Sequence, residues 1–191
     1  MFVHGLVGLD EVGRGCWAGP LVAGAVILSK PITGLKDSKK LTKLQREKLA
    51  IIINKEALAI GLGWVWPEAI DSGGITEAVK NAMQTALQQI KLPYQKVIID
   101  GDFNFLPDIS VAETLIKADD TVPCVSAASI IAKVARDQYM ANMALEFPEY
   151  GFEKHVGYGT ALHLEMLKLH GVTSLHRKSY KPIQSLIGAS V

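Results

Sequence analysis

The sequence predicts an α/β fold in which a mixed central sheet is flanked by helices. Short apolar runs rich in β-forming residues are interspersed along the chain with stretches of helical periodicity, as in α/β proteins. The chain has 191 residues, the size of one large domain. We find no internal repeat, low-complexity tract or Gly/Ser linker that would divide it. We therefore expect one domain over residues 1–191, with a C-terminal helical part from about residue 143.

Five segments have the composition of strands. Most are short and apolar, and are followed by turn-forming residues or by proline. Pro67, for example, ends the third segment. The expected strands are residues 3–9, 21–28, 57–66, 97–99 and 111–116.

Four longer segments have helical patterns. Thr42 and Gln45 stand in capping-box positions at the start of the first, and Gly171 ends the last. In the second, apolar residues recur on one helical stripe. The expected helices are residues 42–54, 75–90, 126–146 and 160–170. The last ten residues or so are weakly patterned, and we expect them to be mobile.

Composition excludes several classes of protein. No stretch approaches the ~18 uninterrupted apolar residues of a membrane span, and the N-terminus lacks the pattern of a secretory signal. Cys16 and Cys124 are too few for a disulfide framework or a cysteine zinc site. We expect a cytoplasmic protein with no membrane association.

Charge is unevenly distributed although the net charge is only +1. Residues 36–55 carry seven Lys/Arg against two Asp/Glu, and residues 151–191 carry five against two. Two basic segments beside an acidic site would suit an anionic polymer. Solvated helix faces are the alternative interpretation.

Acidic residues follow the apolar strands. Asp10 comes after the first strand and Asp100 after the fourth, while Asp119 and Asp120 follow the fifth. Functional groups of an open α/β sheet gather at strand ends, so these carboxylates converge if their strands are neighbours. Glu11 would point to the opposite face of a flat strand and needs a bend to join them. Exposed turn residues are the alternative.

Clustered carboxylates predict a metal site. Hard oxygen ligands with few histidines or cysteines suit Mg²⁺ or Mn²⁺ rather than zinc. Two such ions, about 3.5–4 Å apart, can activate a water and stabilise the leaving oxygen of an in-line displacement. The pattern therefore predicts a metal-dependent nuclease that hydrolyses a phosphodiester bond.

Other segments offer contacts to a nucleic acid. Gly13, Arg14 and Gly15 match neither a Walker A loop nor a dinucleotide fingerprint. Their exposed backbone could read a 2′-hydroxyl, or they could form only a tight turn. Lys39 precedes a helix and could hold a phosphate. Tyr158 lies between glycines and could stack on a sugar or base, or simply pack. The histidines near residues 155–176 could act as general acids or phosphate contacts, or be exposed residues around the last helix.

In this order, the segments resemble the type 2 ribonuclease H family, bacterial ribonuclease HII. The resemblance covers nearly the whole chain, and its first and longest motifs are highly specific. Val156 stands where the family usually has a lysine, and Val172 where proline is common. The loss of that lysine could remove one phosphate contact. The matching motifs are DEVGRG at 10–15, DSKKL at 37–41, IDG at 99–101, KAD at 117–119, SAASIIAKVARD at 126–137, HVGYGT at 155–160 and LHRKSY at 175–180.

The resemblance implies a ribonuclease H-like fold and a substrate. The family cleaves on the 5′ side of a ribonucleotide in RNA/DNA hybrids and in duplex DNA with single embedded ribonucleotides, removing RNA primers and misincorporated ribonucleotides. It uses divalent Mg²⁺ or Mn²⁺. The implied catalytic, metal-binding acids are Asp10, Glu11, Asp100 and Asp119. The implied substrate-binding residues are Gly13, Arg14 and Gly15 for the 2′-hydroxyl, Tyr158 for the neighbouring deoxyribose, and Lys39 and Ser126 for phosphates.

Several expectations compete with or extend this one. A metal-dependent phosphotransferase on a related fold would need a nucleotide-binding glycine loop, which we cannot find. A non-catalytic hybrid-binding protein would tolerate loss of the acids. Asp137 beside Arg136 suggests a structural ion pair outside the metal site. We expect a monomer, and residues 184–187 are loosely like a sliding-clamp peptide.

Overall fold

In a computed structural model, described here for residues 5–188, the protein is built on one mixed sheet. The strand order is β3-β2-β1-β4-β5. The central strand β1 is antiparallel to β2 and parallel to β4. This confirms the predicted mixed sheet. The strands are β1 (Leu6–Val12), β2 (Leu21–Leu28), β3 (Ala57–Val65), β4 (Lys96–Asp100) and β5 (Ala112–Leu115).

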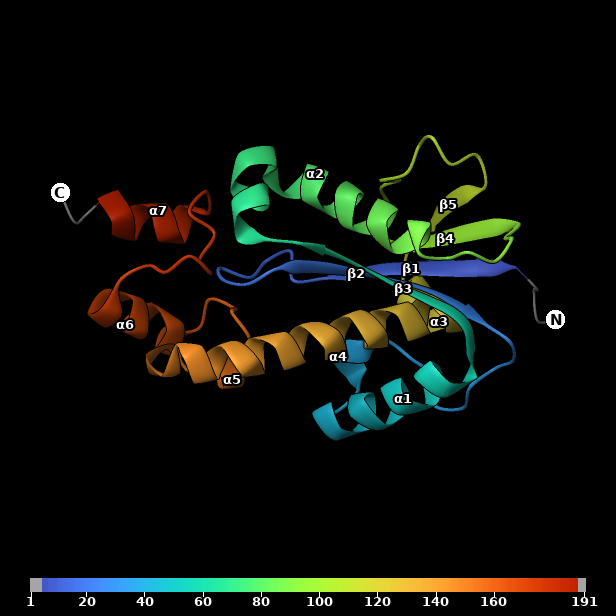
Figure 1. Ribbon diagram of the computed structural model, residues 1–191, viewed down its shortest axis with the longest axis horizontal. Helices are drawn as coiled ribbons and strands as arrows, with labels where there is room; N and C mark the ends of the chain where they lie inside the picture. The colour runs from blue at the N-terminus through green and yellow to red at the C-terminus, as the bar shows by residue number, and fades with distance from the viewer. Residues whose placement is uncertain (1–4, 189–191) are drawn as a thin grey trace.

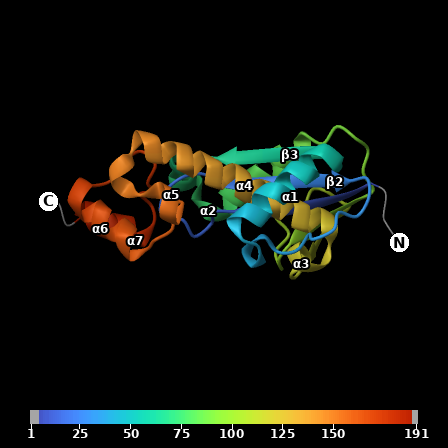
Figure 2. The same ribbon diagram turned by 90° about the horizontal axis from the view of Figure 1, so that it is seen from below.

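Helices cover both faces of the sheet. Helix α2 lies on one face, and α1 and α4 lie on the other (Figure 1). Helices α5, α6 and α7 gather at one end of the molecule (Figure 2). No helix among the described residues is long and apolar enough to span a membrane. The helices are α1 (Lys43–Glu56), α2 (Pro67–Gln88), α3 (Ala118–Thr121), α4 (Pro123–Glu146), α5 (Phe152–His155), α6 (Ala161–His170) and α7 (Lys181–Gly188), with 3-10 turns η1 (Ser38–Lys40) and η2 (Pro148–Tyr150).

Helix boundaries differ from prediction at three places. Helix α2 begins at Pro67 rather than residue 75, because proline suits the first turn of a helix. Gly74 interrupts it with a φ of 79°, which hides the periodicity of its first part. Helix α4 likewise begins at Pro123 rather than residue 126. The expectation that the C-terminal residues are mobile is wrong for α7, whose Ile183 packs in the core; residues 189–191 lie outside the described part.

The start of α1 confirms the capping box. The Thr42 hydroxyl accepts a hydrogen bond from the Gln45 amide at 3.3 Å. The Gln45 side chain accepts one in return from the Thr42 amide at 2.9 Å. Two otherwise unpaired donors at the helix end are thereby satisfied.

Glycines bring α4 unusually close to the sheet. A Cβ on Gly8 of β1 would lie 2.2 Å from the Cys124 carbonyl carbon. A Cβ on Gly24 of β2 would lie 2.5 Å from the Ala128 carbonyl oxygen. No real side chain tolerates such distances, so the glycines allow backbone-to-backbone packing. The first turns of α4 therefore lie directly against β1, which carries Asp10.

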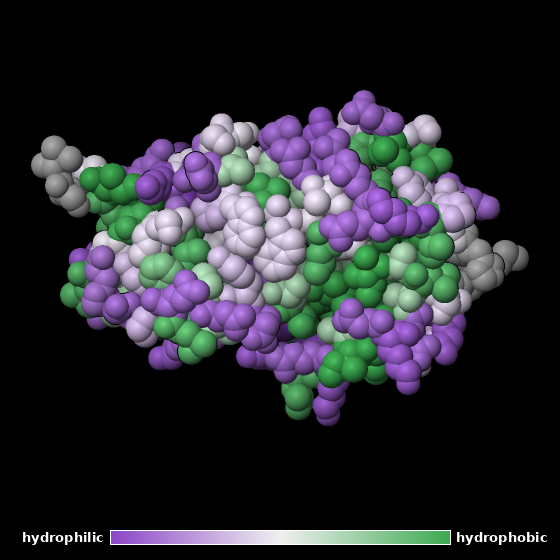
Figure 3. Space-filling model, in the orientation of Figure 1, coloured by the Kyte–Doolittle hydropathy of each residue, from purple (hydrophilic) through white to green (hydrophobic). Residues whose placement is uncertain are grey.

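The edge strand β3 has its own protection. The Gln89 side chain accepts from the Leu62 amide at 3.2 Å and donates to the Leu62 carbonyl at 2.6 Å. This amide occupies the place of a neighbouring strand and blocks further pairing there. Apolar residues gather in the middle of the face shown in Figure 3. Leu58 of β3 has an exposed side chain.

Candidate active site at the ends of strands β1 and β4

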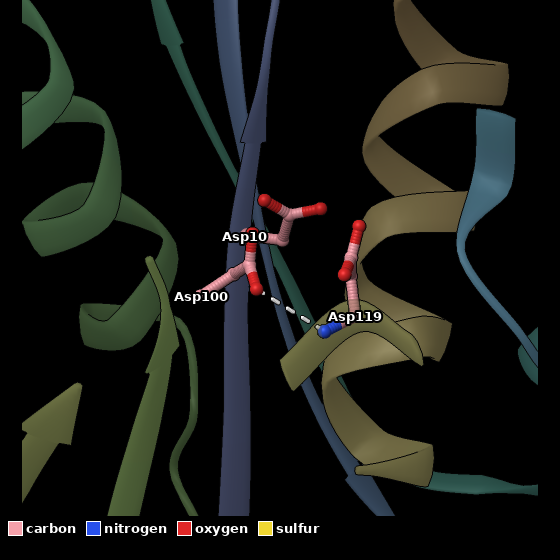
Figure 4. Close-up of side chains that lie close together, drawn as sticks. All are labelled: Asp10, Asp100 and Asp119. Carbon is pink, nitrogen blue, oxygen red and sulfur yellow. Dashed lines mark hydrogen bonds between the residues drawn. The ribbon is translucent and has the colours of Figure 1, made fainter. Parts of the chain in front are cut away.

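Three acidic side chains meet beside the carboxyl-terminal end of β4. Asp10 belongs to β1, Asp100 ends β4 and Asp119 lies in α3 (Figure 4). Each offers a carboxylate oxygen, and these oxygens all lie within 4.8 Å of one another. The predicted convergence is therefore confirmed for these three acids.

Strand pairing explains why Asp10 and Asp100 meet. Leu9 of β1 is in register with Ile99 of the parallel strand β4, so the residue after each lies at the same level of the sheet. Asp119 is brought in by a turn at Lys117, which adopts a left-handed conformation with a φ of 60°. The Asp119 amide then donates to the Asp100 carboxylate at 3.2 Å (Figure 4).

The electrostatics of this cluster favour a cation. Burial, followed by the charge of Glu11, raises the pKa of Asp10 well above its ordinary value, while a hydrogen bond from Ser129 opposes the rise. Burial and the charge of Asp100 raise the pKa of Asp119 to about 6. Among the described residues, no lysine or arginine forms an ion pair with any of the three acids. A set of carboxylate oxygens without a protein counter-charge fits a hard divalent cation.

Glu11 lies beside this group but outside it. Strand β1 keeps its register with β2 through Val12, so the bend that Glu11 would need in order to join the three acids is absent. Neighbouring residues of a strand point to opposite faces. The Glu11 carboxylate instead pairs with Arg14 at 3.3 Å. Burial raises the pKa of Glu11, Arg14 lowers it and the charge of Asp100 raises it, so Glu11 is still close to the acidic site.

Sequence reasoning missed a polar stripe on helix α4. Ser126, Ser129, Lys133 and Arg136 follow at spacings of three, four and three residues, which places them on one helical face. Ser129 contacts Asp10, and its hydroxyl is also hydrogen-bonded to the Ser38 hydroxyl at 2.9 Å. Polar residues at helical spacing within an otherwise apolar helix were the signal available in the sequence.

The structure gives the surroundings of three further residues for which contacts were expected. Ser126 is buried, and its hydroxyl donates to the Asp119 carbonyl at 2.6 Å, so its position supports a role in holding Asp119 rather than a phosphate. Lys39 is exposed, and its charge lowers the pKa of nearby Asp119. Asp137 forms an ion pair as expected, but with Lys133 at 2.7 Å and Arg46 at 3.7 Å rather than with Arg136. Adjacent residues of a helix do not face each other.

Hydrogen bonds from Arg177 and Tyr180 hold the loop that contains Arg14. The Arg14 carbonyl accepts from the Arg177 guanidinium at 3.0 Å and from the Tyr180 hydroxyl at 2.5 Å. Arg177 is fully buried and also donates to the Gly19 carbonyl. A carbonyl with two donors has no further lone pair to offer. The loop therefore presents its remaining backbone groups to a ligand.

Tyr158 is partly exposed at the far end of the α4 stripe. The Lys133 ammonium lies 5.7 Å from the centre of its ring, and the Arg136 guanidinium 6.0 Å from it. Lys133 is one helical turn beyond Ser129, or about 6 Å along the helix axis. Burial raises the pKa of the Tyr158 hydroxyl to about 12, so it remains a hydrogen-bond donor at neutral pH.

Three histidines form a buried network behind Tyr158, so the expectation of exposed histidines is wrong for them. His163 Nδ1 lies 2.9 Å from the Tyr158 carbonyl, and its Nε2 lies 3.0 Å from His176 Nε2. The Thr173 amide donates to His176 Nδ1, so His176 donates through Nε2 and His163 accepts. His155 stacks on His163 with ring centres 4.4 Å apart. The network requires neutral rings.

We predict that this network makes the protein sensitive to acid. Burial lowers the pKa of His163 to about 4 and that of His176 to about 3. A histidine with a lowered folded pKa stabilises the fold above its unfolded pKa of about 6.5 and loses that contribution as pH falls through the window below it. The His176→Gln variant should therefore lose less thermal stability than the wild type between neutral pH and about pH 4. His170→Gln, at an exposed position, is the control; equal slopes for all three proteins would contradict the prediction.

Fold and site together define a class of protein. A mixed sheet of this strand order with acids clustered at its central strands is the arrangement of a metal-dependent nuclease of the ribonuclease H type. The family model described as "Ribonuclease HII" matches residues 7–183, nearly the whole chain. The chain belongs to the ribonuclease HII family, and it is an endoribonuclease that acts on RNA/DNA and depends on divalent metal.

Individual relatives agree with this assignment. The chain is 47% identical over 186 residues to a ribonuclease HII of Janthinobacterium, covering 96% of this chain and 88% of that one. It is 46% identical over 184 residues to a ribonuclease HII of Bacillus cereus, covering 95% and 71%. Ribonuclease H2 of Pyrococcus horikoshii superposes with a TM-score of 0.83 at 30% identity, over 96% and 97% of the two chains. Ribonuclease HII of Archaeoglobus fulgidus, solved in complex with PCNA, superposes with a TM-score of 0.80 at 30% identity, over 95% and 96%.

Proposed function

We propose that the whole chain acts as one catalytic domain that cuts on the 5′ side of a ribonucleotide, with Asp10, Glu11, Asp100 and Asp119 as the metal-binding acids. The observation that carries the proposal is the convergence of three carboxylates within 4.8 Å, none of which is ion-paired with a lysine or arginine among the described residues. Divalent Mg²⁺ or Mn²⁺ bound there would supply charge neutralisation and a reactive water for in-line hydrolysis. Glu11 is close enough for the charge of Asp100 to raise its pKa, and its carboxylate would complete the ligand set.

The remaining residues position the substrate. The backbone of Gly13, Arg14 and Gly15 faces the ribose 2′-hydroxyl; because Arg177 and Tyr180 occupy the Arg14 carbonyl, other backbone groups of the loop bind it. Exposed Lys39, close to Asp119, contacts a backbone phosphate. Ser126 and Ser129 act behind the acids by holding Asp119 and Asp10.

A nicking assay tests the function. A DNA duplex with one embedded ribonucleotide is incubated with the protein and either Mg²⁺ or Mn²⁺, and the product ends are mapped. We expect a single cut on the 5′ side of the ribonucleotide, leaving 3′-hydroxyl and 5′-phosphate ends. Folded protein with metal that leaves the duplex intact, while binding it, would favour a hybrid-binding protein instead.

We predict that Tyr158→Ala impairs cleavage at a single embedded ribonucleotide more than it impairs folding. The ring is the exposed aromatic at the end of the α4 stripe, and losing one stacking contact should lower kcat/KM roughly tenfold. Tyr158→Phe separates the ring from the hydroxyl, since it keeps the stacking face. Tyr139 is a partly exposed tyrosine within α4, and Tyr139→Ala controls for a general effect on that helix. Unchanged cleavage by Tyr158→Ala would remove the stacking role.

We also propose that the enzyme works as a cytoplasmic monomer that can contact a sliding clamp through α7. Ile187, within the clamp-like residues 184–187, is 42% exposed on this helix. The complex of the Archaeoglobus fulgidus relative with PCNA supports such a contact. The free cysteines, Cys16 and Cys124, are both buried, in keeping with a reducing compartment. Light scattering of the enzyme alone measures whether it is a monomer. Light scattering of its mixture with a bacterial sliding clamp measures whether the two proteins bind.

A further inference from the structure

A second surface beside the acids has no role in the scheme above. It is a cavity of about 240 Å³ that shares Asp100 with the acidic cluster. Helix α2 provides Thr76, and the segment after β4 provides the aromatic wall. The residues that line it are Arg14, Thr76, Asp100, Gly101, Asp102, Phe103 and Phe105.

Phe103 is the unusual member of this lining. Its side chain is 56% exposed, although it follows Asp100 by only three residues. It is held by Phe105, whose ring lies 4.7 Å from it at an angle of 61°. Phe105 is itself only 6% exposed and packs in the core beneath α2. The buried Phe105 thus holds the exposed Phe103 ring in the lining of the cavity beside the acids.

The cavity and Tyr158 adjoin helices that lie on opposite faces of the sheet. Tyr158 contacts Lys133 and Arg136 of α4, which covers one face of the sheet. The cavity is bounded by α2, which covers the other face (Figure 1). In Figure 4, Asp10 and Asp100 stand between the helices of the two layers. A strand whose scissile phosphate lies at the acids therefore has one neighbouring nucleotide on each side.

The charges of the cavity indicate which part of a nucleotide it takes. Asp100 and Asp102 line it and would repel a phosphate. The Arg14 guanidinium lies 5.6 Å from the centre of the Phe105 ring and pairs with Glu11, so it offers limited charge to a second anion. A flat, uncharged base or sugar face suits an exposed phenylalanine, since every base has a π-face to stack.

We propose that Phe103 stacks on the nucleotide of the cleaved strand that adjoins the scissile phosphate on the side away from Tyr158, and so positions that phosphate at the acids. The inference rests on the proposed role of the acids. Phe103 and Tyr158 then hold the strand from both sides of the cut.

A fluorescent base analogue tests this directly. Duplexes carry one ribonucleotide and a stacking-sensitive base at successive positions on either side of it, and are bound to the Asp10→Asn variant with Mg²⁺ so that they stay intact. We expect the fluorescence to change at one position on one side, and this change to disappear when Phe103→Ala is added. Loss of the signal at that position only in Tyr158→Ala, and not in Phe103→Ala, would overturn the proposal.

Kinetics of the otherwise unaltered enzyme provide the second measurement. Phe103→Ala should lower kcat/KM roughly tenfold, the scale of one lost aromatic stack, while Phe103→Trp keeps activity. Phe103→Leu keeps the apolar volume and should behave like Phe103→Ala. Leu145→Ala, at an 83% exposed position far along α4, is the matched control. If the wild type cleaves and Phe103→Ala cleaves equally well, this inference fails alone; if the wild type does not cleave, the proposed function fails first.

Discussion

Replacing Asp10 by asparagine is expected to abolish cleavage while leaving the fold and duplex binding in place. Asp10 is buried, interacts electrostatically with Asp100 and is hydrogen-bonded to Ser129. Asparagine keeps the shape but removes the charge that a divalent cation needs. We expect kcat to fall by about three orders of magnitude or more, the scale on which removal of a catalytic group acts. Asp100→Asn should behave in the same way.

The same substitution should stabilise the protein in the absence of metal. The raised pKa of Asp10 means that its ionised form is unfavourable in the fold, so the metal-free protein loses stability as pH rises from the unfolded pKa toward the folded one. The asparagine side chain of the variant carries no such charge. Thermal unfolding with chelator should therefore show a higher Tm for Asp10→Asn than for the wild type, and added Mn²⁺ should raise the Tm of the wild type far more than that of the variant.

Asp120→Asn is the matched control for this experiment. Asp120 is the next residue after Asp119, but it lies outside the cluster and pairs with Lys40 at 2.7 Å. Its replacement should leave both cleavage and the Mn²⁺ response nearly unchanged. If Asp10→Asn lost duplex binding in proportion to turnover, or lost stability without metal, Asp10 would be a structural residue rather than a metal ligand.

The central sheet could be predicted because its strands carry local signals. The sequence alone predicts β2 and β4 from their apolar runs, and the start of α1 from its capping box. None of these predictions depends on elements that are distant along the chain. The first half of α2 was missed because Gly73 and Gly74 interrupt its pattern. Helix α7 was missed for another reason: it is short, and Ile183 becomes a core residue only through contacts with distant elements. Such packing cannot be inferred from periodicity alone.

The candidate site was predictable in part. Asp100 ends β4 as expected, whereas β1, predicted as residues 3–9, runs over Leu6–Val12 and carries Asp10 within it. Asp10 and Asp100 were expected to converge, and the register of two parallel strands brings this about. The position of Asp119 depends on the left-handed turn at Lys117. A lysine in the sequence does not predict this conformation. The buried histidines were misplaced because their partners are a threonine, a tyrosine carbonyl and one another, each set by tertiary structure.

Arg136→Met is expected to be the most destabilising of the substitutions considered. Arg136 is fully buried and donates to the carbonyls of Pro20 at 2.8 Å, Val156 at 2.8 Å and Ala18 at 3.0 Å. Among the ion pairs of the described residues, none includes it, so its charge is balanced by carbonyl dipoles and by the ring of Tyr158. Methionine fills much of the volume but leaves three carbonyls unsatisfied, at about 1–3 kcal/mol each. We expect the unfolding free energy to fall by about 3–9 kcal/mol.

This loss should also reach the active site, because Arg136 joins its two recognition loops. Ala18 and Pro20 continue the segment of Gly13 and Gly15, and Val156 lies two residues before Tyr158. Chemical denaturation measures the stability, and nicking at low temperature, where the variant stays folded, measures the site. Gln138→Met, exposed on the same helix, controls for the substitution itself. If folded Arg136→Met cut as well as the wild type, Arg136 would serve the core only, and the two loops would hold their positions independently.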